Sequence, residues 1–178
     1  AIVAAGFAVG GKAMLNSTSS AHIARVTISG VISGDKRTLD MLKNVAESKA
    51  AAVIVTVNSP GGTTTGSEAL YDAIRKIGET KPVVAVIDGT AASGGYIAAL
   101  GTDRIIARQT SIVGSIGVLF QFPNVSRLMD TVGVKLEEIK SSPLKAAPNG
   151  FEPTSPEARA ALQKVVDDNY DWFKRLVR

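Results

Sequence analysis

The chain has 178 residues, a net charge of +4 and no cysteine. This length favours one domain with a substantial core. Aromatic residues make up only 5% of the chain and the basic residues are scattered, which argues against a nucleic-acid surface built from a basic stripe with stacking aromatics. The lack of cysteine excludes disulfides and argues against a zinc site. We expect no metal and no other cofactor.

The beginning of the chain differs in composition from the rest. Residues 1–10 are apolar, and residues 16–20 (NSTSS) are typical of a polar linker. The apolar stretch is shorter than the roughly 20 residues that a membrane-spanning helix needs. It is either the end of a membrane anchor or a disordered or edge-strand arm. We expect residues 1–20 to form this arm and residues 21–178 to form a single domain.

Strands alternate with helices along the remaining chain. Apolar, mostly β-branched runs predict strands at 22–28, 52–57, 83–87, 104–107, 117–120 and 134–139. Apolar residues on one face predict helices at 36–49, 63–78, 125–132, from 93, and from 154 to the C-terminus. The last helix is expected to begin with a Thr154-x-x-Glu157 capping box and Pro156 in its first turn. The alternation predicts an α/β fold with a parallel sheet and flanking helices, whose functional loops follow the carboxyl ends of the strands.

Two glycine-rich loops follow two of these strands. The first is Pro60-Gly61-Gly62 and the second is Ser93-Gly94-Gly95. A serine between a buried strand and a helix, flanked by small residues, has an exposed hydroxyl beside free backbone N–H groups. If the loops face each other, the amides of Gly62 and Gly94 can bind one oxyanion. Either loop alone would be explained as a packing turn, whereas the pair favours a catalytic site.

These loops do not match other glycine-rich motifs. The sequence has no Gly-x-x-x-x-Gly-Lys-Ser/Thr run, and no Gly-x-Gly-x-x-Gly follows the first strand. The Gly-x-Ser-x-Gly elbow is absent because residues 91–95 read AASGG. The one histidine, His22, stands at the start of the first predicted strand, so we expect it at the surface or at the sheet edge, and only the less favoured alternative makes it a base.

A serine without a histidine can be activated by a lysine. The lysine must be neutral, so its pKa has to fall from about 10.4 to about 7–8. Residues 138–148 (EIKSSPLKAAP) offer Lys140 and Lys145. Lys140 follows two glutamates and is expected to be a solvated partner of them, whereas Lys145 lies among apolar residues. From the residues alone, Lys145 is either the base or an ordinary loop lysine.

Four motifs, in this order, resemble the signal peptide peptidase A family. They are NSPGG (58–62), AASGGY (91–96), GSIGV (114–118) and IKSSPLKAA (139–147). This family consists of membrane-bound bacterial and archaeal serine proteases with a Ser–Lys dyad. The resemblance runs from about Ile23 to the end of the chain. It implies a ClpP/crotonase-like fold, in which repeated β-β-α or βα units form a parallel sheet with flanking helices.

The resemblance also implies roles for individual residues. Ser93 would be the nucleophile, Lys145 the general base, and Ser115 a residue that orients the lysine. The backbone N–H groups of Gly62 and Gly94 would be the oxyanion donors. The family usually has Ser-Gly before the lysine.

Here Ser142-Pro143-Leu144 stands before the lysine instead. Proline stiffens the loop, so the position of Lys145 is less closely defined by the resemblance than that of Ser93.

The implied activity is endopeptidase cleavage of short apolar peptides, such as signal peptides that remain after secretion. The family implies a membrane-anchored, extracytoplasmic protease domain that forms a homo-oligomeric ring, with Lys145 supplied by a neighbouring subunit. Peptides, and no nucleic acid, are the expected partners. Two other functions stay open: a crotonase-type acyl-CoA enzyme with the same fold and paired amides, and a non-catalytic oligomeric scaffold.

Overall fold

The computed structural model describes residues 21–178, so the arm expected for residues 1–20 lies outside the described residues. The described chain divides into two compact units. The first reaches to Ile116 and includes Leu176–Arg178, and the second comprises Gly117–Arg175. Each unit is described by itself below. The expectation of a single domain over residues 21–178 stays a prediction.

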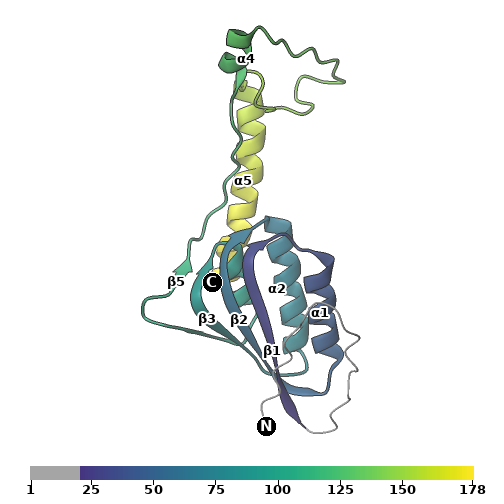
Figure 1. Ribbon diagram of the computed structural model, residues 1–178, viewed down its shortest axis with the longest axis vertical. Helices are drawn as coiled ribbons and strands as arrows, with labels where there is room; N and C mark the ends of the chain where they lie inside the picture. The colour runs from purple at the N-terminus through teal and green to yellow at the C-terminus, as the bar shows by residue number, and fades with distance from the viewer. Residues whose placement is uncertain (1–20) are drawn as a thin grey trace. The chain divides into compact units, whose positions relative to one another are not determined.

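The first unit contains a five-stranded sheet (Figure 1). Its strands are β1 (His22–Ile32), β2 (Ala50–Gly62), β3 (Val83–Ala92), β4 (Arg104–Ala107) and β5 (Ile112–Gly114). The strand order is β1-β2-β3-β4. β4 pairs with the first half of β3 and β5 pairs with its last residues, and every pair is parallel. The predicted α/β fold with a parallel sheet is therefore confirmed. Because the strands are parallel, their carboxyl ends share one edge of the sheet.

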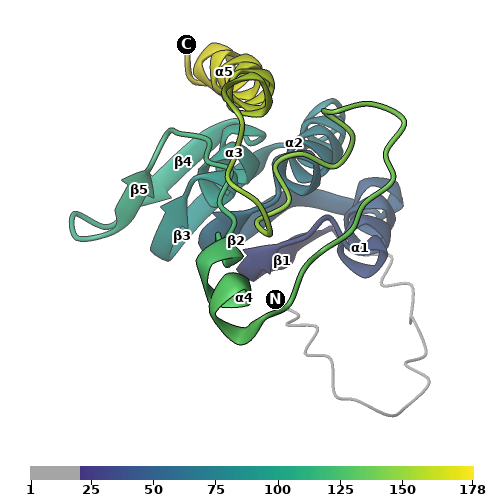
Figure 2. The same ribbon diagram turned by 90° about the horizontal axis from the view of Figure 1, so that it is seen from above.

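Helices cover one face of this sheet (Figure 2). They are α1 (Lys36–Glu47), α2 (Thr64–Gly78) and α3 (Gly94–Leu100). Each helix connects one strand to the next in the order β1-β2-β3-β4. Connections between parallel strands are right-handed, so when each new strand is added on the same side of the previous one, the connecting helices all lie on one face of the sheet. Alternate residues of β2 accordingly point into the core, where Val53, Val55 and Val57 are completely or almost completely buried.

The start of each of the first two helices is fixed by a side chain. The Asp35 carboxylate accepts hydrogen bonds from the Thr38 N–H at 2.9 Å and the Thr38 hydroxyl at 2.8 Å. These bonds hold the pKa of Asp35 below its ordinary value. Thr63 caps α2 by accepting from the Gly66 N–H at 3.1 Å. Both caps lie directly after a carboxyl end of the sheet, so they also direct the chain away from that edge.

Two of the strand predictions are wrong. Residues 117–120 and 134–139 form no strand. Residues 117–120 are a short apolar run and residues 134–139 carry spaced apolar side chains, but no neighbouring strand pairs with either in the described part of the chain. Most of their apolar side chains are exposed: Leu119 is 76% exposed and Ile139 fully so. A strand is stabilised by its partner, so an apolar pattern without one does not suffice. The short strand β5 was not anticipated.

The second unit contains α4 (Ser126–Val132) and most of α5 (Pro156–Val177). Gly133, with φ +72°, ends α4 as its position in the sequence predicted. The cap of α5 differs from the expected one, because the Ala158 N–H donates to the Ser155 hydroxyl at 3.1 Å. Ser155 directly precedes the proline of the first turn and is therefore better placed than Thr154. Within residues 21–178, no helix has both the length and the apolar character that crossing a membrane requires.

Candidate active site

Three chain segments meet at the carboxyl edge of the sheet in the first unit. β2 ends in Ser59-Pro60-Gly61-Gly62, β3 runs into Ser93, and β5 runs into Ser115. The registers align these ends, since Ser59 pairs with Ala91 and Ala92 pairs with Gly114. The two sequence motifs with glycines therefore lie on adjacent strands, as their positions predicted.

Ser93 lies in a strained turn between β3 and α3. Its backbone has φ 51° and ψ −118°, a conformation that side-chain-bearing residues rarely adopt. The Ser93 N–H donates to the Gly114 carbonyl at 2.8 Å, and its carbonyl accepts from the N–H groups of Tyr96 and Ile97. The side chain makes no capping hydrogen bond to α3 and is half-buried. A strained strand-to-helix turn that presents an unused hydroxyl is the local geometry of a nucleophilic serine.

The loop after β2 packs directly against this turn. A Cβ at Gly61, whose φ is +105°, would lie 2.8 Å from the Gly94 nitrogen and 2.9 Å from the Ser93 Cβ. A Cβ at Gly94 would lie 3.2 Å from the Gly62 nitrogen. Only glycine fits at Gly61, because its φ is positive and backbone atoms occupy the space. The two glycine loops are therefore in contact, which is the arrangement that an oxyanion hole built from Gly62 and Gly94 requires.

Two buried serines that sequence analysis missed support these loops. Ser59 is completely buried; its hydroxyl donates to the Gly30 carbonyl at 2.7 Å and accepts from the Gly61 N–H at 3.1 Å. Ser67 is also completely buried and donates to the Thr63 carbonyl at 2.8 Å. A signal for Ser59 exists in the sequence, because it continues the buried alternation of Val53, Val55 and Val57 along β2. A polar residue in that phase of a strand needs buried partners.

Ser115 leaves β5 as Ser93 leaves β3. Gly114, which precedes Ser115, pairs with Ala92, which precedes Ser93. Ser115 also has a positive φ, 52°, and it is exposed. The Ser93 N–H donates to the Gly114 carbonyl at 2.8 Å, so the residue directly before Ser115 is in contact with Ser93. The role expected for Ser115 in orienting a lysine stays a prediction.

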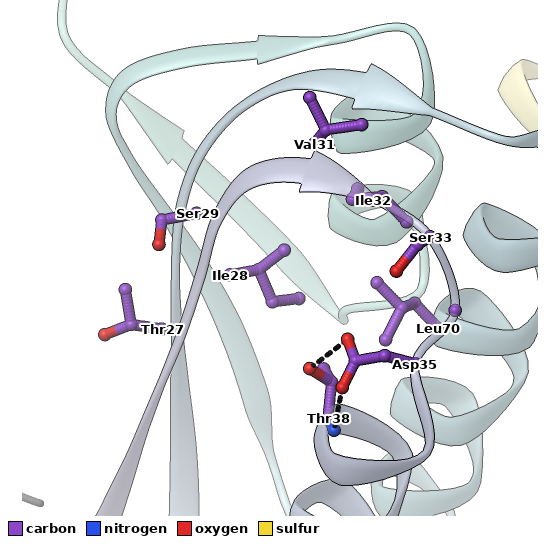
Figure 3. Close-up of a pocket in the computed structure, with 10 residues that line it drawn as sticks. Thr27, Ile28, Ser29, Val31, Ile32, Ser33, Asp35, Thr38 and Leu70 are labelled. Atoms are coloured by element: carbon purple, nitrogen blue, oxygen red, sulfur yellow. Dashed lines mark hydrogen bonds between the residues drawn. The ribbon is translucent and has the colours of Figure 1, made fainter. Parts of the chain in front are cut away.

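A pocket of about 170 Å³ adjoins the same edge at the end of β1 (Figure 3). It is lined by residues of β1, by Leu70 of α2, and by Asp35 and Thr38. Asp35 is the one titratable group among the lining residues, and its carboxylate is bound to Thr38, as the dashed lines show. The carboxylate of this pocket therefore serves the start of α1, and the lining residues offer no pair of titratable groups for catalysis.

His22 lies at the opposite end of the sheet from Ser93. It is the first residue of β1, an 11-residue strand whose other end belongs to the edge described above. At about 3.3 Å per residue, the strand separates His22 from that edge by roughly 30 Å. Within the first unit, His22 is therefore excluded as the base for Ser93.

Lys145 lies in the second unit, in a loop of tight turns. Its N–H donates to the Ser142 carbonyl at 3.1 Å, and the Ala147 N–H donates to the Leu144 carbonyl at 3.2 Å. The Lys145 side chain is exposed. Pro143 occupies the second position of the turn closed by Lys145, a position that proline favours.

Lys140 is bound by two carboxylates. Its amine forms ion pairs with Glu138 and, at 3.1 Å, with Glu152. The hydrogen bond to Glu138, followed by that to Glu152, raises the pKa of Lys140 above its ordinary value. Lys140 is therefore protonated at neutral pH and unsuited to act as a base, in line with the sequence analysis. No group of three or more metal-binding carboxylate or imidazole side chains is found among residues 21–178.

The chain matches two protein-family models. Residues 75–178 match the model described as "Peptidase family S49". Residues 31–113, which include β2, β3 and both glycine loops, match the model described as "Clp protease". The second match agrees with the ClpP-like α/β architecture predicted from the sequence motifs.

Several similar proteins carry protease names. A Synechocystis sp. protein, provisionally named a protease, is 38% identical over 85% of this chain and 55% of its own length. An Enterococcus faecium protein, provisionally named signal peptide peptidase SppA, is 36% identical over 78% of this chain and 41% of its own. A solved membrane protease from Pyrococcus horikoshii, specific for a stomatin homolog, aligns with 24% identity, a TM-score of 0.39, and coverage of 50% of this chain and 46% of that one.

The chain spans 55% and 41% of the lengths of these two curated relatives. The first family match covers more than half of this chain, from within α2 to the C-terminus. It includes Ser93, Ser115 and Lys145, the side chains that the sequence resemblance assigned to catalysis. The chain belongs to peptidase family S49.

Proposed function

We propose that this chain is a serine endopeptidase in which Ser93 is the nucleophile and Lys145 the general base. The observation that carries the proposal is the turn at Ser93. Its strained backbone is held by Gly114, its hydroxyl is not used by α3, and a glycine loop lies against it. Membership of a peptidase family supports a peptide bond as the target and disfavours an acyl-CoA enzyme or an inert scaffold.

In the proposed mechanism, the Ser93 hydroxyl oxygen attacks the peptide carbonyl carbon while neutral Lys145 takes the hydroxyl proton. The N–H groups of Gly62 and Gly94 hold the resulting oxyanion. The lysine ammonium then donates its proton to the peptide nitrogen as the C–N bond breaks. Water then attacks the acyl ester carbon while the neutral lysine takes a proton from it. The lysine ammonium gives that proton to the Ser93 oxygen as the acyl C–O bond breaks, which releases the acid and restores the serine hydroxyl and the neutral lysine.

The contact between the glycine loops supports the proposed oxyanion hole. Gly94 is the first residue of α3. The first N–H groups of a helix have no acceptor within that helix, so the Gly94 N–H is available to an oxyanion. The nitrogen of Gly62 is close to this position, as the 3.2 Å approach of a Cβ at Gly94 indicates. Two such donors are worth about 3–4 kcal/mol each in acyl transfer.

The role of Lys145 requires that its amine lose water. The side chain is exposed in the single chain, and burial is what lowers the pKa of a lysine without a cationic neighbour. We propose that a substrate peptide and a neighbouring subunit cover Lys145, and that the Ser115 hydroxyl orients its amine. The hydrogen bond from the Ser93 N–H to the Gly114 carbonyl, directly before Ser115, supports this role.

The proposed substrates are apolar peptides, including signal peptides left after secretion. The name of the Enterococcus faecium relative supports this class. In addition, Val31, Val113 and Ile116 are 76%, 40% and 38% exposed near strand ends of the catalytic edge. Exposed apolar side chains around a site favour an apolar ligand.

We propose that the protein works as a homo-oligomeric ring at the extracytoplasmic face of a membrane. The second unit supports self-association, because its buried apolar side chains are only Ala158 and Phe173 among the described residues. Its large exposed ones are Leu119, Phe120, Leu128, Val132, Val134, Leu136, Ile139, Leu144, Phe151, Val165 and Tyr170. Apolar surface of this extent is typical of an interface. A neighbouring copy would cover it and supply Lys145 to Ser93.

The catalytic proposal is tested with Ser93→Ala and Lys145→Ala, with Lys135→Ala as a matched control on the same unit. A fluorogenic apolar peptide is the substrate, and a fluorophosphonate reports the reactivity of Ser93. Both catalytic variants should lose at least about a thousandfold in kcat, as removal of either member of a dyad does. The control should keep wild-type kcat. Wild-type cleavage by either catalytic variant would refute the dyad.

The ring is tested by mixing the two inactive variants. If Lys145 serves the neighbouring subunit, some sites in a mixed oligomer combine an intact Ser93 with an intact Lys145, and activity returns. Light scattering on the same samples gives the subunit number. A protein that is monomeric and fully active would contradict the shared site.

A further inference from the structure

A polar cluster closes the loop that carries Lys145. It consists of Glu138, Lys140, Asn149 and Glu152, called here the loop clasp. Lys140 is paired with both glutamates. The Asn149 side-chain amide donates to both Glu138 oxygens, at 3.4 and 3.2 Å, and to Glu152 at 3.3 Å. Each member of the clasp thus contacts at least two others.

The clasp joins the two ends of a short loop. Lys140 directly precedes residues 141–148, and Asn149 directly follows them. Asn149 also stiffens its own end, because its side-chain oxygen accepts from the Phe151 N–H at 2.9 Å. Lys145 therefore lies in the middle of an eight-residue segment that is tied at both ends.

The far end of this loop is anchored independently of the clasp. The buried Gly150 has φ +80°, and its carbonyl accepts from the Val125 N–H at 2.8 Å. A Cβ at Gly150 would lie 2.3 Å from the Pro123 carbonyl oxygen. One end of the loop is thus fixed to the backbone before α4. The clasp then determines where the other end lies relative to it.

The charges of the clasp make it dependent on Lys140. The Lys140 side chain is 19% exposed, and its ammonium lies between the Glu138 and Glu152 carboxylates. Without that ammonium, the Glu138 and Glu152 carboxylates would both bind the neutral amide of Asn149. Two carboxylates that share one site repel each other. Removal of Lys140 should therefore separate the ends of the loop rather than leave it closed.

We propose that the loop clasp positions Lys145 for catalysis. Lys140 and its partners act through the loop and do not touch the reacting atoms, so they are positioning residues. The inference rests on the proposed function, because it concerns the placement of the proposed base. A general base must lie within hydrogen-bond reach of its proton, and a displacement of about 1 Å can cost about a hundredfold in rate.

The first test replaces the lysine with Lys140→Met, which keeps the length of the side chain and removes the charge. Lys140→Arg is the conservative rescue, and Lys135→Met is the control on the same segment. With the fluorogenic apolar peptide, kcat of Lys140→Met should fall about 10–100-fold, whereas KM should stay within about twofold. Lys140→Arg should recover most of the lost kcat. Lys135→Met should behave as wild type.

Hydrogen–deuterium exchange tests the physical basis of the effect. The amides of residues 141–148 should exchange faster in Lys140→Met than in Lys135→Met, whereas the amides of α5 should exchange equally in both. Glu152→Gln, which keeps the shape and removes one charge, should show a smaller loss of kcat. It also serves as the variant to use if Lys140→Met does not fold.

Wild-type kcat in Lys140→Met, or an equal loss in Lys135→Met, would overturn the positioning role. Unchanged exchange of residues 141–148 in Lys140→Met would overturn the clasp itself. Failure of the proposed function would show separately, as full activity of Lys145→Ala. In that case the exchange data would still decide whether the clasp closes the loop.

Discussion

The serine-bearing edge of the first unit and the lysine-bearing loop of the second differ in what surrounds them. Ser93 lies between glycines that leave no room for a Cβ, over completely buried serines. Lys145 lies in an exposed loop held by the polar clasp. The proposed nucleophile is positioned by close packing, which is insensitive to charge. The proposed base is positioned by ionic hydrogen bonds, whose strength depends on the charge of the groups that form them.

The largest effect is expected from Gly62→Ala. A Cβ there would lie 1.9 Å from the Ile32 carbonyl oxygen, and backbone atoms on β1 cannot yield without disrupting the β1–β2 pairing. We expect a loss of about 3 kcal/mol or more in the free energy of unfolding, measured in urea. Gly117→Ala is the control, since a Cβ there meets nothing within 4 Å. Equal stability of the two variants would contradict the packing that distinguishes the first unit.

Lys81 is an exception to the contrast, because it is a buried charge in the first unit. Its ammonium donates to the carbonyls of Val45, Ala46 and Ser48 at 3.2, 2.9 and 2.6 Å, at the end of α1. Lys81→Met leaves these acceptors without their donor and should cost about 2–3 kcal/mol of unfolding free energy. Lys43→Met, on the exposed face of α1, should cost far less. A similar loss in both variants would show that the ammonium contributes nothing specific.

Backbone strain at Ser93 can be measured by comparing two inactive variants. Glycine adopts positive φ at little cost, so Ser93→Gly should be more stable than Ser93→Ala by about 1 kcal/mol. Both should be unreactive toward a fluorophosphonate. Thermal unfolding of the two proteins under one condition provides the measurement. Greater stability of the alanine variant would mean that the turn at Ser93 is not strained.

The smallest expected effects are changes of stability with pH. They differ between the units, because Asp35 of the first unit titrates in acid and Lys140 of the second unit titrates in alkali. The pKa of Asp35 is lowered from 3.8, so its contribution to stability is present above that value and is lost as pH falls through the lower folded pKa. The pKa of Lys140 is raised from 10.5, so its contribution is present below that value and is lost as pH rises through the higher folded pKa. Asp35→Ala should therefore differ from wild type at neutral pH and converge with it in acid.

The alkaline half of this prediction has its own measurement. Urea unfolding of wild type and Lys140→Met should differ at neutral pH and converge as the pH rises through the folded pKa of Lys140, where the ammonium is lost. Equal stability of these two proteins at neutral pH, or a difference that persists unchanged in strong alkali, would contradict the ionic character of the clasp.

Local patterns in the sequence predicted most of the first unit. Strands, helices and the glycine loops follow from alternation, one-faced apolar patterns and turn residues. The strands expected at 117–120 and 134–139 failed because pairing depends on a partner that local pattern does not reveal. The lengths of β1, β2 and β3 were underestimated, since pairing carries these strands on to Ile32, Gly62 and Ala92.

The residues of the candidate site likewise fall into those that local sequence patterns predict and those that depend on contacts between distant segments. Ser93 and the glycine loops could be identified from their positions after buried strands. The support from Ser67 could not, because it depends on the close approach of α2 and the Gly94 position. The pairing of Lys140 with Glu138 was suggested by their proximity in sequence. Its second partner, Glu152, is 12 residues away and becomes visible only when the loop closes.

The pairing of β3 with β5 has a consequence for how the chain can vary. The ladder ends at Ala92 and Gly114, directly before Ser93 and Ser115. The connection between β4 and β5 is a turn closed by a hydrogen bond from the Ser111 N–H to the Arg108 carbonyl at 3.0 Å. Residues inserted at that turn would lengthen a surface bend without altering the ladder. Arg108 and Ser111 are tied to β3, by an ion pair with Asp88 and by a hydrogen bond from the Ser111 hydroxyl to the Ile87 carbonyl. Natural variants and engineered insertions should therefore accumulate between them, at residues 109–110, and a reporter peptide introduced there should leave the ladder of β3 and β5 intact.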